Sequence, residues 1–123
     1  MAENDLKVLL RTMEPVLHPE PYGYAVWDGP LPFQPFATVD EAEGLTVVAP
    51  LSVLGGAHAP WARISLTVHS DLAAVGLTAA FAGALGQGGI SCNVIAGYHH
   101  DHLFVQWDRR FDAMAALKEL SRA

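Results

Sequence analysis

Apolar and polar residues alternate most regularly at the start of the second half of the chain. In ARISLTVHS, residues 62–70, the side chains of Ile64, Leu66 and Val68 fall on one side of an extended backbone, and polar residues fall on the other. A period of two is typical of a strand with one buried face. The segment therefore predicts a half-buried strand.

The next segment, SDLAAVGLTAAFAGALGQGG, changes to a helical period. Leu77, Phe81 and Leu85 recur every four residues, so they share one face of a helix. Ser70 or Asp71 is the expected N-cap, because a short polar side chain there can accept hydrogen bonds from the first free backbone N–H groups. The glycines at the end of the segment supply the expected stop.

Two short β-rich runs and a last helix follow. ISCNVIAGY and HLFVQW are separated by so few residues that they predict a hairpin. Phe111, Met114 and Leu117 recur every three residues and predict an amphipathic helix over residues 109–120. The order from Ala62 onward, β-α-β-β-α, favours an α+β, ferredoxin-like fold with both helices on one face of a small antiparallel sheet. We expect its missing final strand to come from the first half of the chain or from a partner subunit.

The first half of the chain is less regular. Residues 4–13 predict a short helix with Asn4 or Asp5 as its N-cap, and Pro15 ends it. Six prolines between residues 15 and 36 limit the next stretch to short or edge strands, of which YGYAVWD is the clearest. FATVDEAEGLTVVAP predicts a hairpin with an acidic turn, and LSVLGGAHAP predicts a short helical turn or loop.

Composition and charge narrow the function. The 123 residues are 51% hydrophobic and 16% charged, which is typical of a globular chain. Eight acids and two bases in residues 1–61 account for the whole net charge of −6, and no basic stripe could neutralise phosphates. We therefore expect no nucleic-acid or membrane partner. Residues 72–98 contain no charge, but glycines interrupt them, which favours a buried helix and strand over a membrane span.

The compartment is predicted from cysteine usage and from the N-terminus. The single Cys92 excludes an internal disulfide and a cysteine-rich zinc site, as is usual for a reducing cytoplasm. MAENDLKVLL lacks the basic and apolar regions of a signal peptide. We expect a cytoplasmic protein.

Three histidines surround Asp101 in the segment SCNVIAGYHHDHLF. If the hairpin turns near His100 and Asp101, His99 and His102 lie close together across the ladder, and His69 on the neighbouring strand could add a third imidazole. Such a group could bind a divalent metal or act in acid–base catalysis. A polar rim around a ligand pocket explains the same residues, and we favour it; we expect no metal and no cofactor.

The start of the long predicted helix is the second candidate site. A strand that runs into a capped helix leaves backbone N–H groups at the positive end of the helix dipole, where a carboxylate or phosphate binds readily. Gly76 would let a ligand approach closely, although ordinary helix packing explains it equally well. Asn93, a polar residue at an apolar strand start, either satisfies a loop or binds the polar groups of a ligand. Cys92 beside it is expected to be a buried small side chain rather than a nucleophile.

Three segments, AEGLTVVAP, LTVHSDLAAVGLTAA and GISCNVIAGYHHDHLFV, resemble the ACT domain, the regulatory module of aspartokinases and other amino-acid-responsive enzymes. More narrowly, residues 39–120 resemble small stand-alone bacterial ACT proteins of uncharacterised function. The resemblance implies a ferredoxin-like βαββαβ domain over residues 61–123 and a degenerate second ACT-like unit over residues 1–60 that lost a helix. It also implies side-by-side association, as in a homodimer, with small ligands bound at the seam.

The resemblance further implies a set of ligand-binding residues. In the aspartokinase type, the effector is held by the loop after the first strand, the start of the next helix and the start of the second strand. The matching positions here are His69, Ser70, Asp71, Val75, Gly76, Leu77, Asn93, Val94 and Ile95. Similar arginine-sensing ACT proteins add an acidic residue at the hairpin, which matches Asp101, whereas many relatives carry tyrosine in place of His99.

The leading hypothesis is a non-enzymatic regulatory module that binds an amino acid. The α-carboxylate would lie at residues 70–76, Asn93 would fix the orientation, and Asp101 would receive a basic or ammonium group. Binding at a subunit seam would change dimer stability or the affinity for a regulated partner protein.

Two alternatives belong to other classes of protein. The first is a structural or assembly ACT protein that binds no ligand, because Val75 and Leu77 fill the seam. The second is a metal-dependent enzyme built on His69, His99 and His102.

Overall fold

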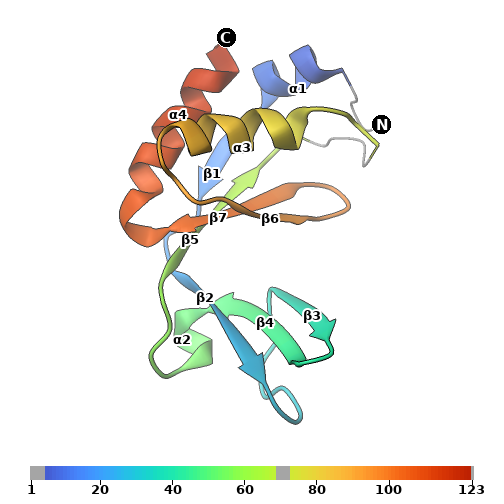
Figure 1. Cartoon of the computed structure of the whole chain (residues 1–123), viewed down its shortest axis with the longest axis vertical. Helices are drawn as coiled ribbons and strands as arrows, with labels where there is room; N and C mark the ends of the chain where they lie inside the picture. Colours follow the sequence, from blue (N-terminus) through green and yellow to red (C-terminus); the bar gives the residue numbers. More distant parts are fainter. Residues whose placement is uncertain (1–4, 69–72, 123) are drawn as a thin grey trace.

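One antiparallel sheet runs through the molecule and curls between two lobes (Figure 1). The computed structural model describes residues 5–68 and 73–122. The strands pair in the order β3-β4-β2-β5-β7-β6, and β1 pairs with β5 alongside. In chain order the elements are α1 (Leu6–Thr12), β1 (Pro15–Leu17), β2 (Tyr22–Trp27), β3 (Ala37–Glu41), β4 (Gly44–Pro50), α2 (Leu51–Leu54), β5 (Trp61–Leu66), α3 (Leu77–Gln87), β6 (Asn93–Ala96), β7 (Asp101–Gln106), the 3-10 helix η1 (Trp107–Arg109) and α4 (Arg110–Arg122).

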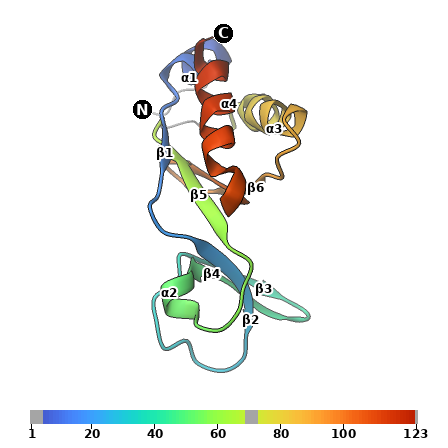
Figure 2. The ribbon, with the colours of Figure 1, turned by 90° about the vertical axis from the view of Figure 1, so that its left-hand side faces the viewer.

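The helical lobe consists of β1, β5, β6 and β7 with α1, α3 and α4 on one face (Figure 2). The alternation predicted for β5 is confirmed: Ala62, Ile64 and Leu66 face the helices and have no exposed surface. Phe81 from α3 and Leu117 from α4 complete this core, and both are also fully buried. Apolar burial between one sheet face and the helices therefore holds the lobe together, as a ferredoxin-like α+β fold requires.

The first half of the chain supplies the strand that the second half lacks. β1 pairs antiparallel with β5, with Pro15 opposite Leu66, so it occupies the open edge of β5. Proline is tolerated there because it is the first residue of the strand. Asp5 caps α1 by accepting a hydrogen bond from the Lys7 N–H at 2.9 Å. The sequence did not predict β1, and it gave no sign that α1 packs on the second half.

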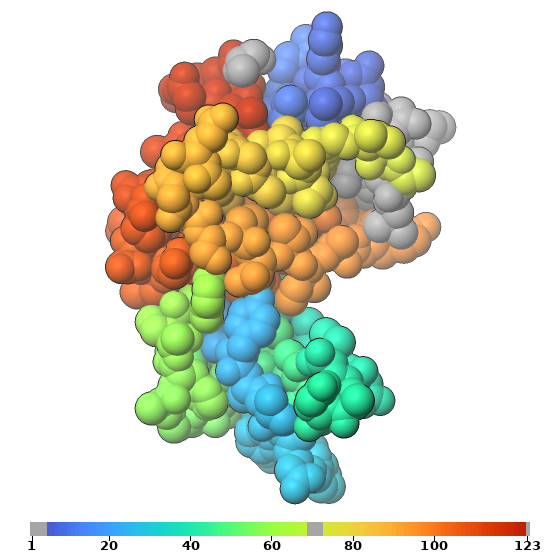
Figure 3. Space-filling model, viewed as in Figure 1, coloured from blue at the N-terminus to red at the C-terminus, as the bar shows by residue number. Residues whose placement is uncertain are grey.

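The small lobe consists of β2, β3, β4 and α2, and it confirms the predicted strand, hairpin and helical turn of the first half. Val47, Ala49 and Leu54 form its buried centre. A β-carbon on Gly23 would lie 2.6 Å from Leu51 Cδ2, so the glycine lets α2 sit directly on β2. Figure 3 shows the two lobes meeting at a waist below the β6–β7 hairpin. The division of the chain at residue 60 stays a prediction.

The long helix begins later than the sequence predicted. α3 starts at Leu77, so it does not begin at Ser70 or Asp71, which lie outside the described residues. The reason is Gly76, whose φ of +96° is a left-handed conformation that cannot continue an α-helix. Gly76 is thus the residue before the helix and not part of its second turn, whereas the predicted glycine stop after Gln87 is confirmed.

The C-terminal helix confirms two positions of the predicted apolar stripe and corrects the third. Leu117 is fully buried and Met114 packs against the core, whereas Phe111 is 67% exposed. Phe111 instead lies against the Arg110 guanidinium, whose central carbon is 4.5 Å from the ring centroid. The favourable contact between a cation and the face of an aromatic ring offsets part of the free-energy cost of leaving the ring exposed. No helix in the described part of the chain is long and apolar enough to cross a membrane.

Candidate functional site

Five of the ten predicted ligand-binding residues lie in the connection between β5 and α3, and a sixth, Leu77, is the first residue of α3. His69, Ser70 and Asp71 lie outside the described residues. Val75 is 82% exposed at the surface, whereas Leu77 is 4% exposed and belongs to the core of the helical lobe. Of these side chains, Val75 is available to a ligand or a second molecule and Leu77 is not.

Gly76 leaves the start of α3 without a side-chain cap. Its carbonyl accepts the first helical hydrogen bond from the Ala80 N–H at 2.9 Å, but a glycine has no side chain to satisfy the N–H groups of the first turn. These groups and the helix dipole favour an anion at this end. A β-carbon on Gly76 would also lie 3.1 Å from Leu6 Cδ2, so the glycine serves packing against α1 as well.

Replacing Gly76 by alanine is expected to destabilise the fold by about 1 kcal/mol, because alanine resists a positive φ and its methyl group would crowd Leu6. Urea-induced unfolding measures this difference. Gly83→Ala is the matched control within α3: nothing lies within 4 Å of its added β-carbon, so this change is expected to stabilise the helix by about 0.5–1 kcal/mol. Equal effects of the two substitutions would contradict a required left-handed residue at position 76.

The hairpin turn lies nearer the N-terminus than predicted. The Gly97 N–H donates to the His100 carbonyl at 2.9 Å, so Tyr98 and His99 form the tip. His102 therefore pairs with Ile95 and does not lie opposite His99, which corrects the proposed histidine pair. Within the described part of the chain, no three His, Cys, Asp or Glu side chains are grouped so that they could hold a metal ion.

The turn between β6 and β7 lies at the same end of the sheet as the start of α3 (Figure 1), and Asp101 is the first residue of β7 after this turn. His100 Nδ1 is 3.4 Å from the Val68 carbonyl oxygen, which brings the hairpin beside the end of β5. Burial raises the pKa of the Asp101 carboxyl, and the nearby His100 lowers it in part. A cationic group bound here would offset the cost of a half-buried carboxylate.

The register separates Asn93 from the start of α3 within one chain. Asn93 pairs with Phe104, which pairs with Arg63, three residues before the end of β5. At about 3.3 Å per residue, this is about 10 Å from the end of the sheet where α3 begins. Asn93 therefore does not reach a ligand at the helix start within a single chain, because β6 and β5 run in the same direction and Asn93 lies at the far end of β6.

The remaining strand positions divide between the two faces. Val94 packs against the core of the helical lobe, and Ile95 packs on the opposite face with Phe104. Burial raises the pKa of the half-buried Cys92 thiol to about 11, so the thiolate that a nucleophile needs is disfavoured.

The helix-free face of the sheet holds a polar cluster that the sequence did not predict. Ser65 Oγ lies 2.9 Å from His18 Nε2 and 2.7 Å from His102 Nδ1, so one hydroxyl joins two imidazoles. Arg63, two residues earlier on β5, donates from Nη1 to the Tyr22 hydroxyl at 2.8 Å. We call Arg63, His18, Ser65 and His102 the Arg63 cluster.

Both imidazoles of the Arg63 cluster are held neutral. Burial and then the Arg63 charge lower the pKa of His102 to about 4. The same two causes lower the pKa of His18, and Glu20 opposes them in part.

The polar face of β5 was visible in the sequence alternation. His18 and Tyr22, however, come from the proline-rich stretch, where no period shows which face a side chain takes.

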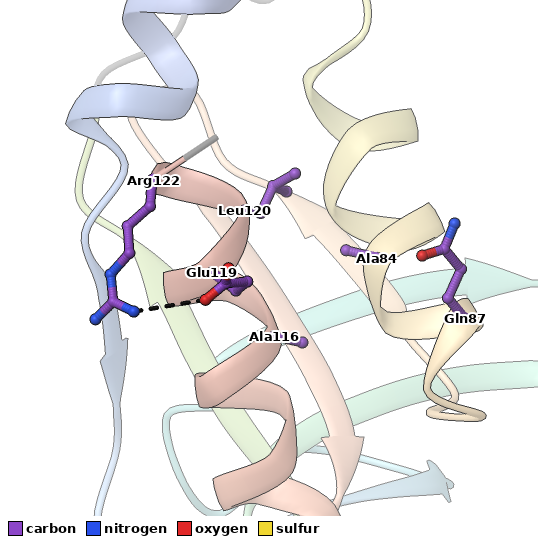
Figure 4. Close-up of a pocket in the computed structure, with 6 residues that line it drawn as sticks. All are labelled: Ala84, Gln87, Ala116, Glu119, Leu120 and Arg122. Carbon is purple, nitrogen blue, oxygen red and sulfur yellow. Dashed lines mark hydrogen bonds and ion pairs between the residues drawn. The ribbon is translucent and has the colours of Figure 1, made fainter.

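Two surface grooves lie away from these sites. One of about 430 Å³ separates α3 from α4, and its wall carries an ion pair between Glu119 and Arg122 at 3.5 Å (Figure 4). Its lining residues are Ala84, Gln87, Ala116, Glu119, Leu120 and Arg122. A second groove, of about 360 Å³, is largely apolar and is bounded by Trp61, Trp107 and Pro60. Neither groove contains a predicted ligand-binding residue.

Comparisons with known proteins bear on these features. Two family models, both described as ACT domain, match residues 1–53 and residues 57–119. A solved structure from Vibrio cholerae, of a protein of unknown function described as a possible transport protein, has 44% sequence identity and a TM-score of 0.82. The match covers 94% of this chain and 95% of that protein.

A more distant structural match extends the likeness in fold alone. The protein Atu0741 from Agrobacterium tumefaciens has 16% identity and a TM-score of 0.75, with 89% of each chain covered. No curated protein matches this chain.

Proposed function

Because this chain belongs to the ACT-domain family, whose members are generally regulatory modules that bind small ligands, we propose that it is a non-enzymatic sensor of an amino acid. The ligand binds at the seam between two copies of the chain. One end of the site is the start of α3, and the other is supplied by β6 of the second copy.

The observation that carries the proposal is the uncapped start of α3. Gly76 provides no side-chain acceptor for the N–H groups of the first turn. The α-carboxylate of an amino acid has the charge and the oxygen atoms that these groups and the helix dipole favour. In this proposal Asp101, which begins β7 at the same end of the sheet, receives the ammonium group or a basic side chain of the ligand.

The position of Asn93 supports a site made by two copies. Within the described residues, β6 pairs only with β7, so one of its edges is open. If two copies join these edges antiparallel about a two-fold axis, the start of one β6 lies beside the end of the other. Asn93 of one copy then approaches the end of the partner's sheet where α3 begins. Within a single chain, Asn93 and the start of α3 remain apart.

Calorimetric titration with the twenty amino acids tests the proposal. One class of amino acid is expected to bind, and sedimentation is expected to show that the ligand shifts the monomer–dimer equilibrium. Asp101→Asn should weaken binding about tenfold, which corresponds to about 1.4 kcal/mol, because a charge-assisted contact is lost. Asp40→Asn, on the exposed face of β3, is the matched control and should bind as the parent does. No binding of any amino acid at millimolar concentration would refute the proposal.

A second candidate is an assembly protein that binds no ligand. It is favoured by Gly76, which is held against Leu6 as a packing residue would be. In this version Val75 alone covers the seam, because Leu77 is already buried in its own core. It predicts a dimer of the same stability with and without amino acids.

Location and partners follow from the proposed role. We propose a cytoplasmic location, where a protein with the single thiol Cys92 needs no disulfide. A regulated partner protein would bind the liganded and unliganded dimers with different affinities.

A further inference from the structure

Arg63 is fixed in place on the helix-free face of the sheet. Its guanidinium carbon lies 4.0 Å from the centroid of the Phe36 ring, and Nη1 donates to the Tyr22 hydroxyl at 2.8 Å. A guanidinium stacked on one ring and bonded to another side chain loses little further conformational freedom when it binds a ligand. It is therefore a preorganised cation.

The positive charge of Arg63 is uncompensated in the described part of the chain. The ion pairs found there are Arg109 with Asp112 and Arg122 with Glu119, so none involves Arg63. Its Nε is buried and has no hydrogen-bond acceptor among residues 5–68 and 73–122. A partly buried charge without a counter-charge is costly, and an under-satisfied donor group calls for a partner.

Further polar groups lie beside the guanidinium. The His18 backbone N–H donates to the Arg63 carbonyl at 2.9 Å, which ties the His18 imidazole to the same strand. Ser65 and His102 are cross-strand partners on β5 and β7. The hydroxyl of Ser65 bonds to both imidazoles, so the three side chains are held as one unit next to a fixed positive charge.

We infer that the Arg63 cluster binds the carboxylate group of a small organic acid. The planar guanidinium fork matches a carboxylate, which can accept two parallel hydrogen bonds from it. All four side chains of the cluster are partly exposed to solvent. The partly exposed ring of Phe36 lies against Arg63 and offers an apolar surface for the carbon part of the acid.

The charge of the site selects among anions. The cluster offers one permanent positive charge and a set of neutral donors, which balances a single carboxylate better than a phosphate dianion. Cations are excluded by Arg63 itself. The imidazoles strengthen the preference for an anion, because a bound anion favours their protonated forms. The affinity for the anion therefore rises as pH falls.

The site lies where the two lobes meet. His18 and Tyr22 come from the end of β1 and the start of β2, Phe36 comes just before β3, and Ser65 and His102 belong to the helical lobe. A ligand bound to all of them stabilises the junction between lobes by linkage. The site is on the opposite face of the sheet from the start of α3, so it does not depend on the proposed amino-acid site.

Titration of the full chain with sodium butyrate, sodium acetate and inorganic phosphate, at constant ionic strength set with chloride, tests the inference. Calorimetry gives the dissociation constant, and NMR of the imidazole nitrogens reports on His18 and His102 directly. Butyrate is expected to bind at millimolar concentration and to shift both imidazole signals, and acetate, which has a shorter carbon part, is expected to bind more weakly. Phosphate binding tighter than butyrate, or butyrate binding that leaves both imidazoles unshifted, overturns the inference.

Matched variants locate the binding. Arg63→Met should weaken butyrate binding at least tenfold, and the affinity of Arg63→Lys should fall between that of Arg63→Met and that of the parent, because lysine keeps the charge but loses the planar fork. Arg122→Met removes an exposed guanidinium on α4 and should bind as the parent does. Ser65→Ala provides a second test, with an expected loss of about threefold to tenfold, if Arg63→Met does not fold. If Arg63→Met folds, parent-like affinity in both variants would refute the site. If Arg63→Met does not fold, parent-like affinity in Ser65→Ala would refute it.

Discussion

Replacing Leu9 by alanine is expected to lower the free energy of unfolding by about 2–5 kcal/mol, the usual range for truncating a fully buried leucine. Leu9 has no exposed surface and packs in the core of the helical lobe, together with Met13. The loss combines the transfer free energy of the removed methyl groups with the cavity left between α1 and the other helices. Chemical denaturation monitored by circular dichroism measures it.

The control for Leu9 is Val39→Ala, which removes apolar atoms from a side chain that is 52% exposed on β3. Its effect is expected to stay within about 0.5 kcal/mol. If Leu9→Ala were as mild as this control, α1 would not be part of the core. Such a result would contradict the packing of the N-terminal segment on the second half of the chain.

Acidification from pH 7 to pH 4.5 is expected to destabilise the protein through His102. The pKa of His102 falls from 6.5 to about 4 on folding, so between these values the unfolded chain binds more protons than the folded one. The contribution of His102 is complete above pH 6.5 and is lost as pH falls towards 4. The full shift is worth about 3 kcal/mol, and we expect roughly half of that because the imidazole is partly exposed to solvent.

His102→Gln isolates this contribution, since an amide keeps hydrogen-bonding capacity for Ser65 but does not titrate. Urea unfolding at a series of pH values should show a shallower pH dependence in the variant than in the parent. His18 acts in the same direction, and the raised pKa of Asp101 acts against it at the acid end. Parallel curves for parent and variant would show that His102 is not kept neutral by the fold.

The secondary structure of the second half could be predicted because burial there is periodic. The alternation in β5 and the four-residue period of α3 each report a single apolar face against one core. The start of α3 could not be found in this way. Ser70 and Asp71 satisfy the rules for an N-cap, but the left-handed backbone at Gly76 decides where the helix begins. A φ value leaves no periodic trace in the sequence.

The candidate sites were predictable to different degrees. Asp101 was expected near the hairpin from its place between two β-rich runs. His102 was assigned to the hairpin rim, yet the turn lies two residues earlier, at Tyr98 and His99, so His102 falls within β7 and pairs with Ser65. The position of the turn sets the register, and the register decides which side chains meet.

The sequence by itself determined the α+β class, the ferredoxin-like order of the second half and the family resemblance, because these depend on local period and on motifs that are contiguous in the chain. The tertiary structure alone decided that β1 completes the sheet and that α1 joins the core. It alone also brought His18 and Arg63 together. Pairing between residues so far apart in the chain depends on which open edge a segment can satisfy and which apolar surface it can cover, and neither quantity is encoded in a local pattern.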